Sequence, residues 1–495
     1  MERLAARLFA GRKYLPLLAL GPVLWHVAVL AQIFAIRLTY PMDAEWMEGG
    51  ELHHAWRWLH GLPVYGPPTQ GFVPYGYPPF HFVVLAAVGK VFGLDYPQGR
   101  AISILLFVLA CAVMFREAWR SVDGGPRGLA LGGLAVGLAA AAFPVTGGWY
   151  DFIRNDTLAL ALPVLAAGLV GDGRITVRRA LVVAALLVAT VYSKQTDIFF
   201  VLWICLFVIV RAWRRGLLLS AVALVVGLGI LGLAQLSTEG WFWKWVTLMS
   251  KHKLNLERLT TGPQLVLDFA PYLYAVPPLV VLLAVKRWLS PRSVLWTGML
   301  VMSVPVSILP HIKAGGFLNN LMPVVFLAGG CTLFLCADLI NGLRRSGHAR
   351  AGAVALGVVL ASAAGWLIVK RYDTRPYVVS AERLRKAVAL NQLVRTLGPD
   401  GGIFIPDHPF LAVRNGVTTP QAHSMAHWDA SSVGLSMDIF GALDRSGARW
   451  LLWGVEGPGP HRPLGRYVYE RPVDALPSMI GHPANPNALF RRPDR

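Results

Sequence analysis

Four carboxylates and two histidines lie within the segment YPMDAEWMEGGELHH, residues 40–54. The carboxylates are Asp43, Glu45, Glu48 and Glu51, and a long apolar run precedes them. Carboxylates in such a setting can act as general bases, or they can stabilise positive charge that develops during a reaction. An acidic cluster in a loop is also often a plain solvated turn, so both interpretations stay open at this point.

Other ionisable side chains lie in short polar segments between later apolar runs. In chain order these candidates are Arg154, Asp156, Lys194, His311 and Lys313. Cations of this kind can hold a phosphate by charge and hydrogen bonds. Two simpler readings remain: Arg154 and Asp156 pair with each other, and Lys194 only extends along its turn toward the membrane surface.

The composition indicates the environment of these residues. The chain has 495 residues, of which 55% are hydrophobic and only 15% are charged, whereas a soluble domain usually has about 25% charged residues. The net charge of +19 comes from short Lys and Arg clusters between apolar runs, a pattern that sets membrane orientation. We therefore expect a polytopic protein of the lipid bilayer and no nucleic-acid partner.

The cysteines predict neither a disulfide framework nor a metal site. All four lie inside apolar runs, at Cys111, Cys205, Cys331 and Cys336. Their spacing matches no metal-ligand pattern. The histidines His53, His54 and His60 also lack a tight ligand arrangement, so we expect no metal site.

Apolar runs long enough to cross a bilayer predict about eleven transmembrane helices. The predicted spans are 15–37, 100–116, 128–145, 157–171, 180–193, 197–211, 216–236, 265–285, 293–310, 318–339 and 351–369. We expect the first span to be uncleaved, because it is too long for a signal-peptide core. With this count the basic clusters all fall on one side, which the positive-inside rule makes the cytoplasm. They lie at the N-terminus (Arg3, Arg7, Arg12, Lys13) and in 116–127, 171–179, 211–215, 286–292 and 341–350.

The first outer loop, residues 38–99, predicts two interfacial helices. One begins near Glu51, because Gly49 and Gly50 disfavour helix and an apolar stripe follows them. The other occupies residues 78–93, with prolines suited to its first turn. It is placed on the bilayer surface because a crossing there would put most basic clusters outside.

The odd number of spans places the C-terminal part outside the cytoplasm. Residues 371–495 are more polar and predict a small α/β domain with a helix at 381–398 and strands at 401–406 and 448–455. The remaining segment, residues 462–495, is rich in proline, and we expect it to be loosely ordered.

Two segments carry a resemblance to a known family. WMEGGELHHAWRWLHGLPVY (46–65) and FVPYGYPPFHFVVLAAVGKVFG (72–93) resemble the first outer loop of the GT-C glycosyltransferase superfamily. The branch they resemble contains the bacterial enzymes related to protein O-mannosyltransferases and lipid A aminoarabinose transferases. The matching positions are Glu48 in the acidic pair, the turn His60-Gly61, and Tyr65 after it. They continue with Pro78-Pro79 at the start of the second interfacial helix, Phe92-Gly93 at its end, and Arg100 at the start of the next span.

Later segments add to this resemblance, and one position departs from it. FIRNDTLALAL (152–162) is similar to the second outer loop, and YSKQTDIFF (192–200) is similar to a conserved turn with Lys194 as its lysine. The first acid of the family's pair is replaced by Met47. Either Asp43 or Glu45 is then left to supply the missing carboxylate from a shifted position.

The resemblance implies transfer of a sugar from a polyprenyl-phosphate carrier to a lipid, glycan or protein acceptor at the periplasmic face of the bacterial inner membrane. It implies that Glu48 or Asp43 deprotonates the acceptor and that Asp156 orients it. Lys194 and Arg154, helped by His311 and Lys313, would hold the lipid phosphate. His54 and Tyr77 are further candidates for substrate binding. No cofactor is expected, although some branches of the superfamily bind a divalent cation.

Two alternatives remain from other classes. A transporter or flippase of lipid-linked glycans would also be polytopic, but transporters usually have internal repeats and place ionisable groups near mid-membrane. The sequence shows neither feature. A non-catalytic envelope scaffold is the other alternative, and the Met47 departure keeps it open.

Overall fold

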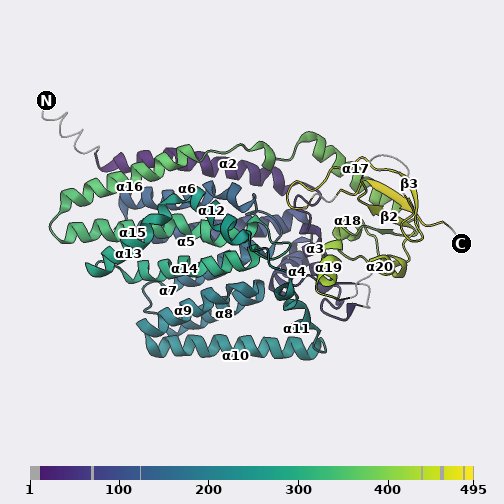
Figure 1. Cartoon of the computed structure of the whole chain (residues 1–495), viewed down its shortest axis with the longest axis horizontal. Helices are drawn as coiled ribbons and strands as arrows, with labels where there is room; N and C mark the ends of the chain where they lie inside the picture. Colours follow the sequence, from purple (N-terminus) through teal and green to yellow (C-terminus); the bar gives the residue numbers. More distant parts are fainter. Residues whose placement is uncertain are drawn as a thin grey trace.

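A computed structural model describes residues 12–68, 72–122, 124–435, 439–456, 462–482 and 485–493. The chain forms a bundle of long helices with a small sheet-containing domain at one end (Figure 1). This confirms the predicted class, a helical membrane protein with a small C-terminal α/β part. The predicted basic cluster at the N-terminus is not among the described parts of the chain. Arg3 and Arg7 precede the described residues, and the side chains of Arg12 and Lys13 are not described.

Every predicted span coincides with helical structure. In chain order these helices are η1 (Arg12–Ala19) with α2 (Leu20–Leu38), α5 (Tyr96–Arg120), α6 (Gly125–Ala141), α7 (Asn155–Val170), α8 (Val177–Ser193), α9 (Ile198–Arg211), α10 (Trp213–Ser237), α12 (Arg258–Phe269) with α13 (Val276–Val285), α14 (Pro291–His311), α15 (Met322–Arg345) and α16 (Ala349–Val369). Short 3-10 turns complete the set at η3 (Phe143–Thr146), η4 (Gln195–Asp197), η5 (Leu248–Lys251), η6 (Pro271–Ala275), η7 (Leu318–Leu321) and η8 (Arg375–Tyr377).

The lengths and compositions of these helices make the chain a multi-pass membrane protein. Among the described residues, six helices are long and apolar enough to cross a bilayer, and a seventh is added if the α12–α13 pair, bent by 93°, counts as one span. The predicted total of about eleven crossings therefore stays a prediction.

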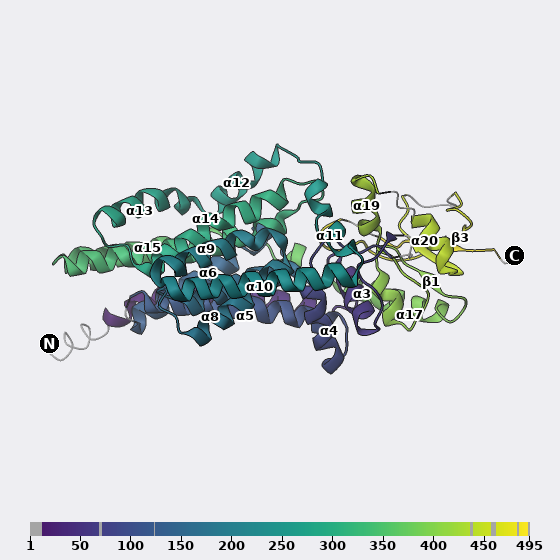
Figure 2. The same cartoon turned by 90° about the horizontal axis from the view of Figure 1, so that it is seen from below.

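Burial separates the central helices from those at the edge. The most apolar window of the Leu318–Arg345 helix is 83% buried, whereas that of α10 is only 6% buried. The glycines of α15 permit close packing, because a Cβ at Gly330 would meet the side chain of Met114 and one at Gly329 would meet Leu138. The exposed leucines of α10 are accordingly the part of the bundle most suited to face lipid. Figure 2 shows this helix running along the outside of the bundle.

Several predicted cytoplasmic loops meet at one end of the bundle, which we name the inner end after the predicted topology. Glu117 forms ion pairs with Arg116 at 2.9 Å and with Arg292 at 3.0 Å. Asn341 Nδ2 donates to the carbonyl of Ser121 at 2.7 Å. The basic loops 116–127, 286–292 and 341–350 are therefore neighbours, as expected for loops on the same side of the membrane.

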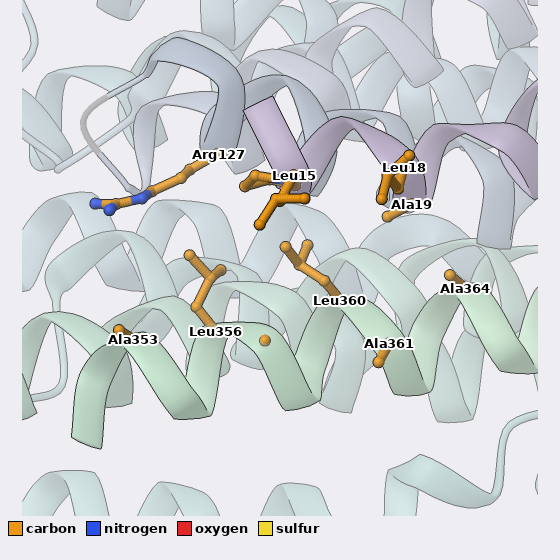
Figure 3. A pocket seen from close by; sticks show the side chains of 11 residues that line it. Leu15, Leu18, Ala19, Arg127, Ala353, Leu356, Leu360, Ala361 and Ala364 are labelled. Atoms are coloured by element: carbon orange, nitrogen blue, oxygen red, sulfur yellow. The ribbon is translucent and has the colours of Figure 1, made fainter. Parts of the chain in front are cut away.

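A lipid-facing groove of about 540 Å³ also lies toward this end, between η1 and α16 (Figure 3). Leucine and alanine side chains line it, and Arg127 is its charged member. Nothing in this lining offers reactive chemistry, and the groove lies at the opposite end of the bundle from the residues predicted to form the site.

The other end, which we name the outer end, carries the two helices predicted for the first loop. They are α3 (Glu48–Leu59) and α4 (Phe80–Phe92). Helix α3 begins at Glu48 instead of near Glu51, so the expectation that the two glycines delay the helix is wrong. Asp43 accepts a hydrogen bond from the Gly49 amide, and Glu48 accepts one from the Ala44 amide at 2.7 Å. The bond to Asp43 satisfies a donor in the first turn of α3, and the bond to Ala44 fixes Glu48 against the preceding loop, so both offset the low helix propensity of glycine.

The C-terminal part forms a four-stranded sheet with covering helices. Its elements are α17 (Ala381–Leu397), β1 (Ile403–Phe404), α18 (Pro409–Arg414), α19 (Ser424–Ser432), α20 (Ile439–Ser446), β2 (Trp450–Trp453), β3 (Val468–Pro472) and β4 (Ala488–Arg491). The strand order is β1-β2-β4-β3, with β1 parallel to β2 and the other pairs antiparallel. The predicted helix and both predicted strands are present. The expectation of a loosely ordered tail is wrong, because β4 pairs with β2 and buries Leu489 and Phe490.

This part docks onto the outer end through polar contacts with the first loop. Asn391 Nδ2 donates to the carbonyl of Pro41 at 3.1 Å, and Arg414 pairs with Asp95 at 2.8 Å. The Met479 amide donates to the carbonyl of Ala44 at 2.9 Å. The first loop is therefore held between the membrane helices and the C-terminal part, together with the short helix α11 (Trp241–Val246).

Candidate functional site at the outer end

Glu48 anchors the first outer loop. Arg100 on α5 donates to both of its carboxylate oxygens, from Nε at 3.0 Å and from Nη2 at 2.6 Å. The amides of Ala44 and Ile153 also donate to Glu48, at 2.7 and 3.1 Å. Both side chains are fully buried. Because its oxygens are fully engaged, Glu48 joins the first loop to the second and to α5.

Asp43 ties the first loop to the C-terminal part. Its carboxylate contacts His408 Nδ1 at 2.5 Å and accepts the Gly49 amide. Burial raises the pKa of Asp43, and the charge of His408 opposes that rise. In a parallel arrangement, Glu51 on α3 contacts His81 on α4 at 2.8 Å. Asp43 and Glu51 therefore connect elements, as Glu48 does.

His54 supports the aromatic segment of the first loop. Its Nδ1 contacts the carbonyl of Gly50 at 2.6 Å, and its Nε2 accepts the Tyr75 amide at 2.9 Å. The ring stacks between Tyr75 and Phe82, with centroids 4.6 and 4.5 Å away. Burial lowers the pKa of His54 to about 3, so the ring is neutral. With both nitrogens occupied, His54 acts on the position of Tyr75.

Glu45 differs from the other carboxylates of its loop. Its Oε2 lies 3.8 Å from Nη1 of Arg154 and accepts the Met47 amide at 3.3 Å. Its Oε1 is buried and has no hydrogen-bond partner among the described residues. Burial raises the pKa of Glu45 to about 8, against the opposing charge of Arg154. Of the two residues open to replace the missing acid at Met47, Glu45 is the one that approaches the cations of the second loop.

Arg154 occupies the centre of this cluster. It immediately precedes α7, and its Nη2 donates to the hydroxyl of Tyr77 at 3.2 Å while the guanidinium lies 5.6 Å from that ring. The side chain is 3% exposed, yet its Nε and Nη1 donors have no hydrogen-bond partner within the described ranges. More than 90% of buried polar groups in native proteins have partners. Unpaired donors beside an unpaired Glu45 oxygen therefore indicate a place for a ligand or for water.

Asp156 and Lys194 form the adjoining pair. Lys194 Nζ donates to Asp156 Oδ1 at 2.7 Å and to Asn320 Oδ1 at 3.0 Å. The other oxygen of Asp156 accepts from Asn319 Nδ2 at 3.0 Å. The alternative in which Arg154 pairs with Asp156 is therefore wrong, because each has another partner. Lys194 is buried and paired, so it does not simply extend to the membrane surface.

Lys313 adds a further cation, and His311 shapes the turn that carries it. The half-buried ammonium of Lys313 has its pKa lowered by burial and by the nearby charge of Lys194. His311 Nδ1 contacts the carbonyl of Phe317 at 3.2 Å and so bridges the 311–317 turn. Of the residues predicted from the sequence, Arg154, Asp156, Lys194, Tyr77 and Lys313 are brought together, whereas Asp43, Glu48, His54 and His311 hold the surrounding elements.

Two residues absent from the sequence-based predictions also approach the cluster. Asp429 on α19 is buried, and the nearby positive charge of Arg154 lowers its pKa against the rise caused by burial. His252, just after η5, lies 3.6 Å from it. No local pattern marks either residue, because their proximity arises only when the C-terminal part docks. Among the described residues, no group of three or more His, Cys, Asp or Glu side chains is arranged to hold a metal ion.

Comparison with known proteins gives structural similarity without sequence matches. No family model matches the chain, and no curated protein matches it. ArnT from Cupriavidus metallidurans bound to undecaprenyl phosphate is similar with a TM-score of 0.46 and 16% identity, over 86% of this chain and 78% of that one. The Archaeoglobus fulgidus oligosaccharyltransferase in complex with Zn and sulfate gives 0.41 and 13%, over 86% and 67%. The archaeal oligosaccharyltransferase AglB from the same organism, with an inhibitory peptide and a dolichol-phosphate, gives 0.36 and 11%, over 86% and 69%.

All three matches are distant, with TM-scores below 0.5 and at most 16% identity. The fold and the site define the class: a multi-pass membrane protein with a buried cluster of carboxylates and cations at one end of its helices.

Proposed function

We propose that the chain is a membrane glycosyltransferase, which moves a sugar from a polyprenyl-phosphate carrier to a lipid, glycan or protein acceptor at the periplasmic face of a bacterial inner membrane. One observation carries the proposal. Three outer loops converge so that Glu45 lies 3.8 Å from Arg154, and Lys194 lies 2.7 Å from Asp156, with unpaired buried atoms on Glu45 and Arg154.

The cations suit a phosphate leaving group. When the bond between the sugar C1 and the phosphate oxygen breaks, the phosphate gains negative charge. Arg154 has two unpaired N–H donors, and the half-buried ammonium of Lys313 lies near Lys194. Charge-assisted hydrogen bonds from such groups, made in a buried setting, stabilise the developing charge more than they would in water.

Glu45 suits the general base. Its unpaired Oε1 would take the proton of the acceptor as the acceptor attacks C1. Asp156 keeps a fixed position through Lys194 and Asn319, so it would orient the reacting groups and stabilise positive charge on the sugar ring. In this proposal Asp43 and Glu48 serve as anchors, since their oxygens are already engaged by His408 and Arg100.

The interfacial helices suit the entry of a lipid-borne donor. Val91 and Phe92 at the end of α4 are 72% and 71% exposed, and Trp58 on α3 is 44% exposed. Apolar side chains exposed beside a membrane bundle are typical of elements that lie in the interface. A carrier held there would present its phosphate sideways to the cluster, while water reaches the site from the side of the C-terminal part.

The proposal is tested by comparing lipids and glycans of a deletion strain with those of its parent by mass spectrometry. We expect one sugar modification to disappear and its polyprenyl-phosphate sugar to accumulate. Expression of the wild-type chain or of Lys253→Ala, which removes an exposed loop lysine, should restore the modification. Lys194→Ala should not. Movement of a lipid-linked glycan across vesicles without cleavage of its glycosidic bond would instead support the flippase alternative.

A further inference from the structure

Helix α19 of the C-terminal part brings a carboxylate to the cluster. Asp429 is 3% exposed and belongs to a short helix on the side of the C-terminal part that faces the bundle (Figure 1). The apolar face of α19, with Ala426 and Ala430, packs into a cluster that also contains Tyr75 of the first loop and Trp245 of α11. This packing fixes the position of Asp429 relative to the first loop.

His252 faces Asp429 from a different element. Its Nε2 lies 3.6 Å from Asp429 Oδ1, which is longer than a hydrogen bond. Its Nδ1 lies 3.3 Å from the carbonyl of Ala314, and the ring contacts Trp428 edge to face at 6.0 Å. The imidazole is 5% exposed. Both His252 Nε2 and Asp429 Oδ1 are buried and have no hydrogen-bond partner in the described part of the chain.

The two unpaired atoms share one chemical character. A proton on Nδ1 of His252, donated toward Ala314, leaves Nε2 as a hydrogen-bond acceptor. An ionised Asp429 is also only an acceptor. Two buried acceptors that face each other at 3.6 Å are unfavourable without a donor between them. A hydroxyl or amine placed there would satisfy the pair.

The pair adjoins the cluster that holds the sugar donor in the proposed function. The positive charge of Arg154 is close enough to lower the pKa of Asp429. The negative charges of Asp156 and Asp429 both raise the pKa of Tyr77, which therefore lies near both carboxylates. Burial raises the pKa of Asp429 to about 7, and the charge of Arg154 opposes that rise by favouring the ionised carboxylate. Arg154 immediately precedes α7 and Lys194 immediately follows α8, whereas Asp429 lies on α19 of the C-terminal part and His252 follows η5.

We propose, on the basis of the proposed function, that Asp429 and His252 form the acceptor-binding half of the site. They would bind a polar group of the acceptor beside its attacking atom. An amine can donate hydrogen bonds to both Oδ1 and Nε2, and a hydroxyl can donate one to either of them. The lipid phosphate of the sugar donor would occupy the other half, formed by Arg154, Lys194 and Lys313. The C-terminal part then completes the substrate-binding site instead of serving only as a cover.

The test measures the two halves separately on the purified full-length protein. The first probe is undecaprenyl phosphate, with binding followed by intrinsic tryptophan fluorescence. We expect Asp429→Asn and His252→Ala to bind it within about twofold of the wild type, and Lys194→Ala to bind it about tenfold more weakly or worse. Asp444→Asn, an exposed carboxylate on α20 of the same part, is the matched control.

The second probe is an envelope extract of the deletion strain with its lipids retained, which carries the unmodified acceptor. With the lipid-linked sugar in excess, this extract is diluted serially and the initial rate of transfer is measured. We expect Asp429→Asn and His252→Ala to need about tenfold more extract for half-maximal rate. Asp444→Asn should match the wild type.

Two results would overturn the inference while leaving the proposed function intact. One is an unchanged dependence on the extract in Asp429→Asn and His252→Ala. The other is a lower unfolding temperature in these variants together with binding of undecaprenyl phosphate that weakens as much as the dependence on the extract, which would make the pair a structural latch for α19. A wild-type protein that transfers no sugar and releases no polyprenyl phosphate would overturn the proposed function itself, and the inference with it.

Discussion

At the scale of single residues, the carboxylates of the first outer loop differ in their hydrogen-bond and ion-pair partners. Glu48 is surrounded by Arg100 and backbone amides, whereas Glu45 has one distant cation and one unpaired oxygen. A carboxylate whose oxygens are filled stabilises structure, and one with a free oxygen beside a cation can exchange a proton. In the proposed function, the same residue type therefore has two roles a few positions apart.

The anchoring role of Glu48 predicts an effect on stability. Glu48→Gln leaves the buried Arg100 guanidinium without its counter-charge, which should lower the free energy of unfolding by about 3–5 kcal/mol. Thermal unfolding of the protein in detergent measures this. Glu382→Gln, at an exposed position on α17, should unfold like the wild type. An unchanged unfolding temperature together with lost transfer would instead return Glu48 to the role of base.

The proposed base predicts a pH dependence. Glu45 must be ionised to accept a proton, and burial raises its pKa to about 8. The rate of transfer at low substrate concentration should therefore rise from pH 6, reach half its maximum near pH 8 and level off above about pH 9. Glu45→Gln should lower the rate by about 10²- to 10⁴-fold. A rate that falls over this pH range would contradict the assignment, as would normal turnover by the variant.

At the scale of elements, α3 depends on a close approach by the aromatic segment. A Cβ on Gly50 would collide with the ring and hydroxyl of Tyr75, whereas one on Gly21 in α2 would meet nothing within 4 Å. Gly50→Ala should therefore displace Tyr75 and its partner His54, and lower the free energy of unfolding by about 1–3 kcal/mol.

Gly21→Ala is the matched control, since it exchanges the same residues in another helix. It should leave the unfolding temperature unchanged or raise it slightly, because alanine favours helix. Equal unfolding temperatures for Gly50→Ala and the wild type would contradict the packing of Tyr75 against α3.

The elements differ in how far the sequence alone predicts them. Apolar runs predicted the membrane helices, because length and hydropathy are local properties of a segment. Strand β3 was missed because it has mostly exposed side chains and ends in Pro472. Strand β4 was missed because its burial depends on pairing with β2, about forty residues away.

The site was predicted in part, for a related reason. The loops that carry Arg154, Asp156 and Lys194 could be named, since polar residues between apolar runs stand out. The choice between Asp43 and Glu48 as the base could not be made, because Arg100 lies 52 residues from its partner Glu48 and His408 lies 365 residues from Asp43. Asp429 and His252 likewise approach each other only through tertiary contacts.

At the scale of the whole molecule, charge divides along the long axis of the bundle. The basic loops around Glu117 and Asn341 meet at the inner end, and the buried carboxylates lie at the outer end with the C-terminal part. This division matches the predicted topology, in which the inner end faces the cytoplasm.

The topology predicts which positions an impermeant thiol reagent reaches in intact cells. In a chain whose four native cysteines are replaced, Lys253→Cys at the outer end should react with such a maleimide directly. Arg350→Cys at the inner end should react only after permeabilisation. Both positions are exposed on the protein surface, so a difference in labelling reports only the side of the membrane on which each lies. Equal labelling in intact cells, or the reverse order, would contradict the assignment of the two ends.

The most direct test of the central claim is the release of polyprenyl phosphate by the purified protein from a lipid-linked sugar fraction of its own membranes, in the presence of envelope acceptor. The wild type and Lys253→Ala should release it at the same rate. Lys194→Ala should release it about 10²-fold more slowly, because the leaving phosphate loses a buried cation. No release by the wild type, or equal rates in all three proteins, would contradict the claim that this buried cluster transfers a sugar.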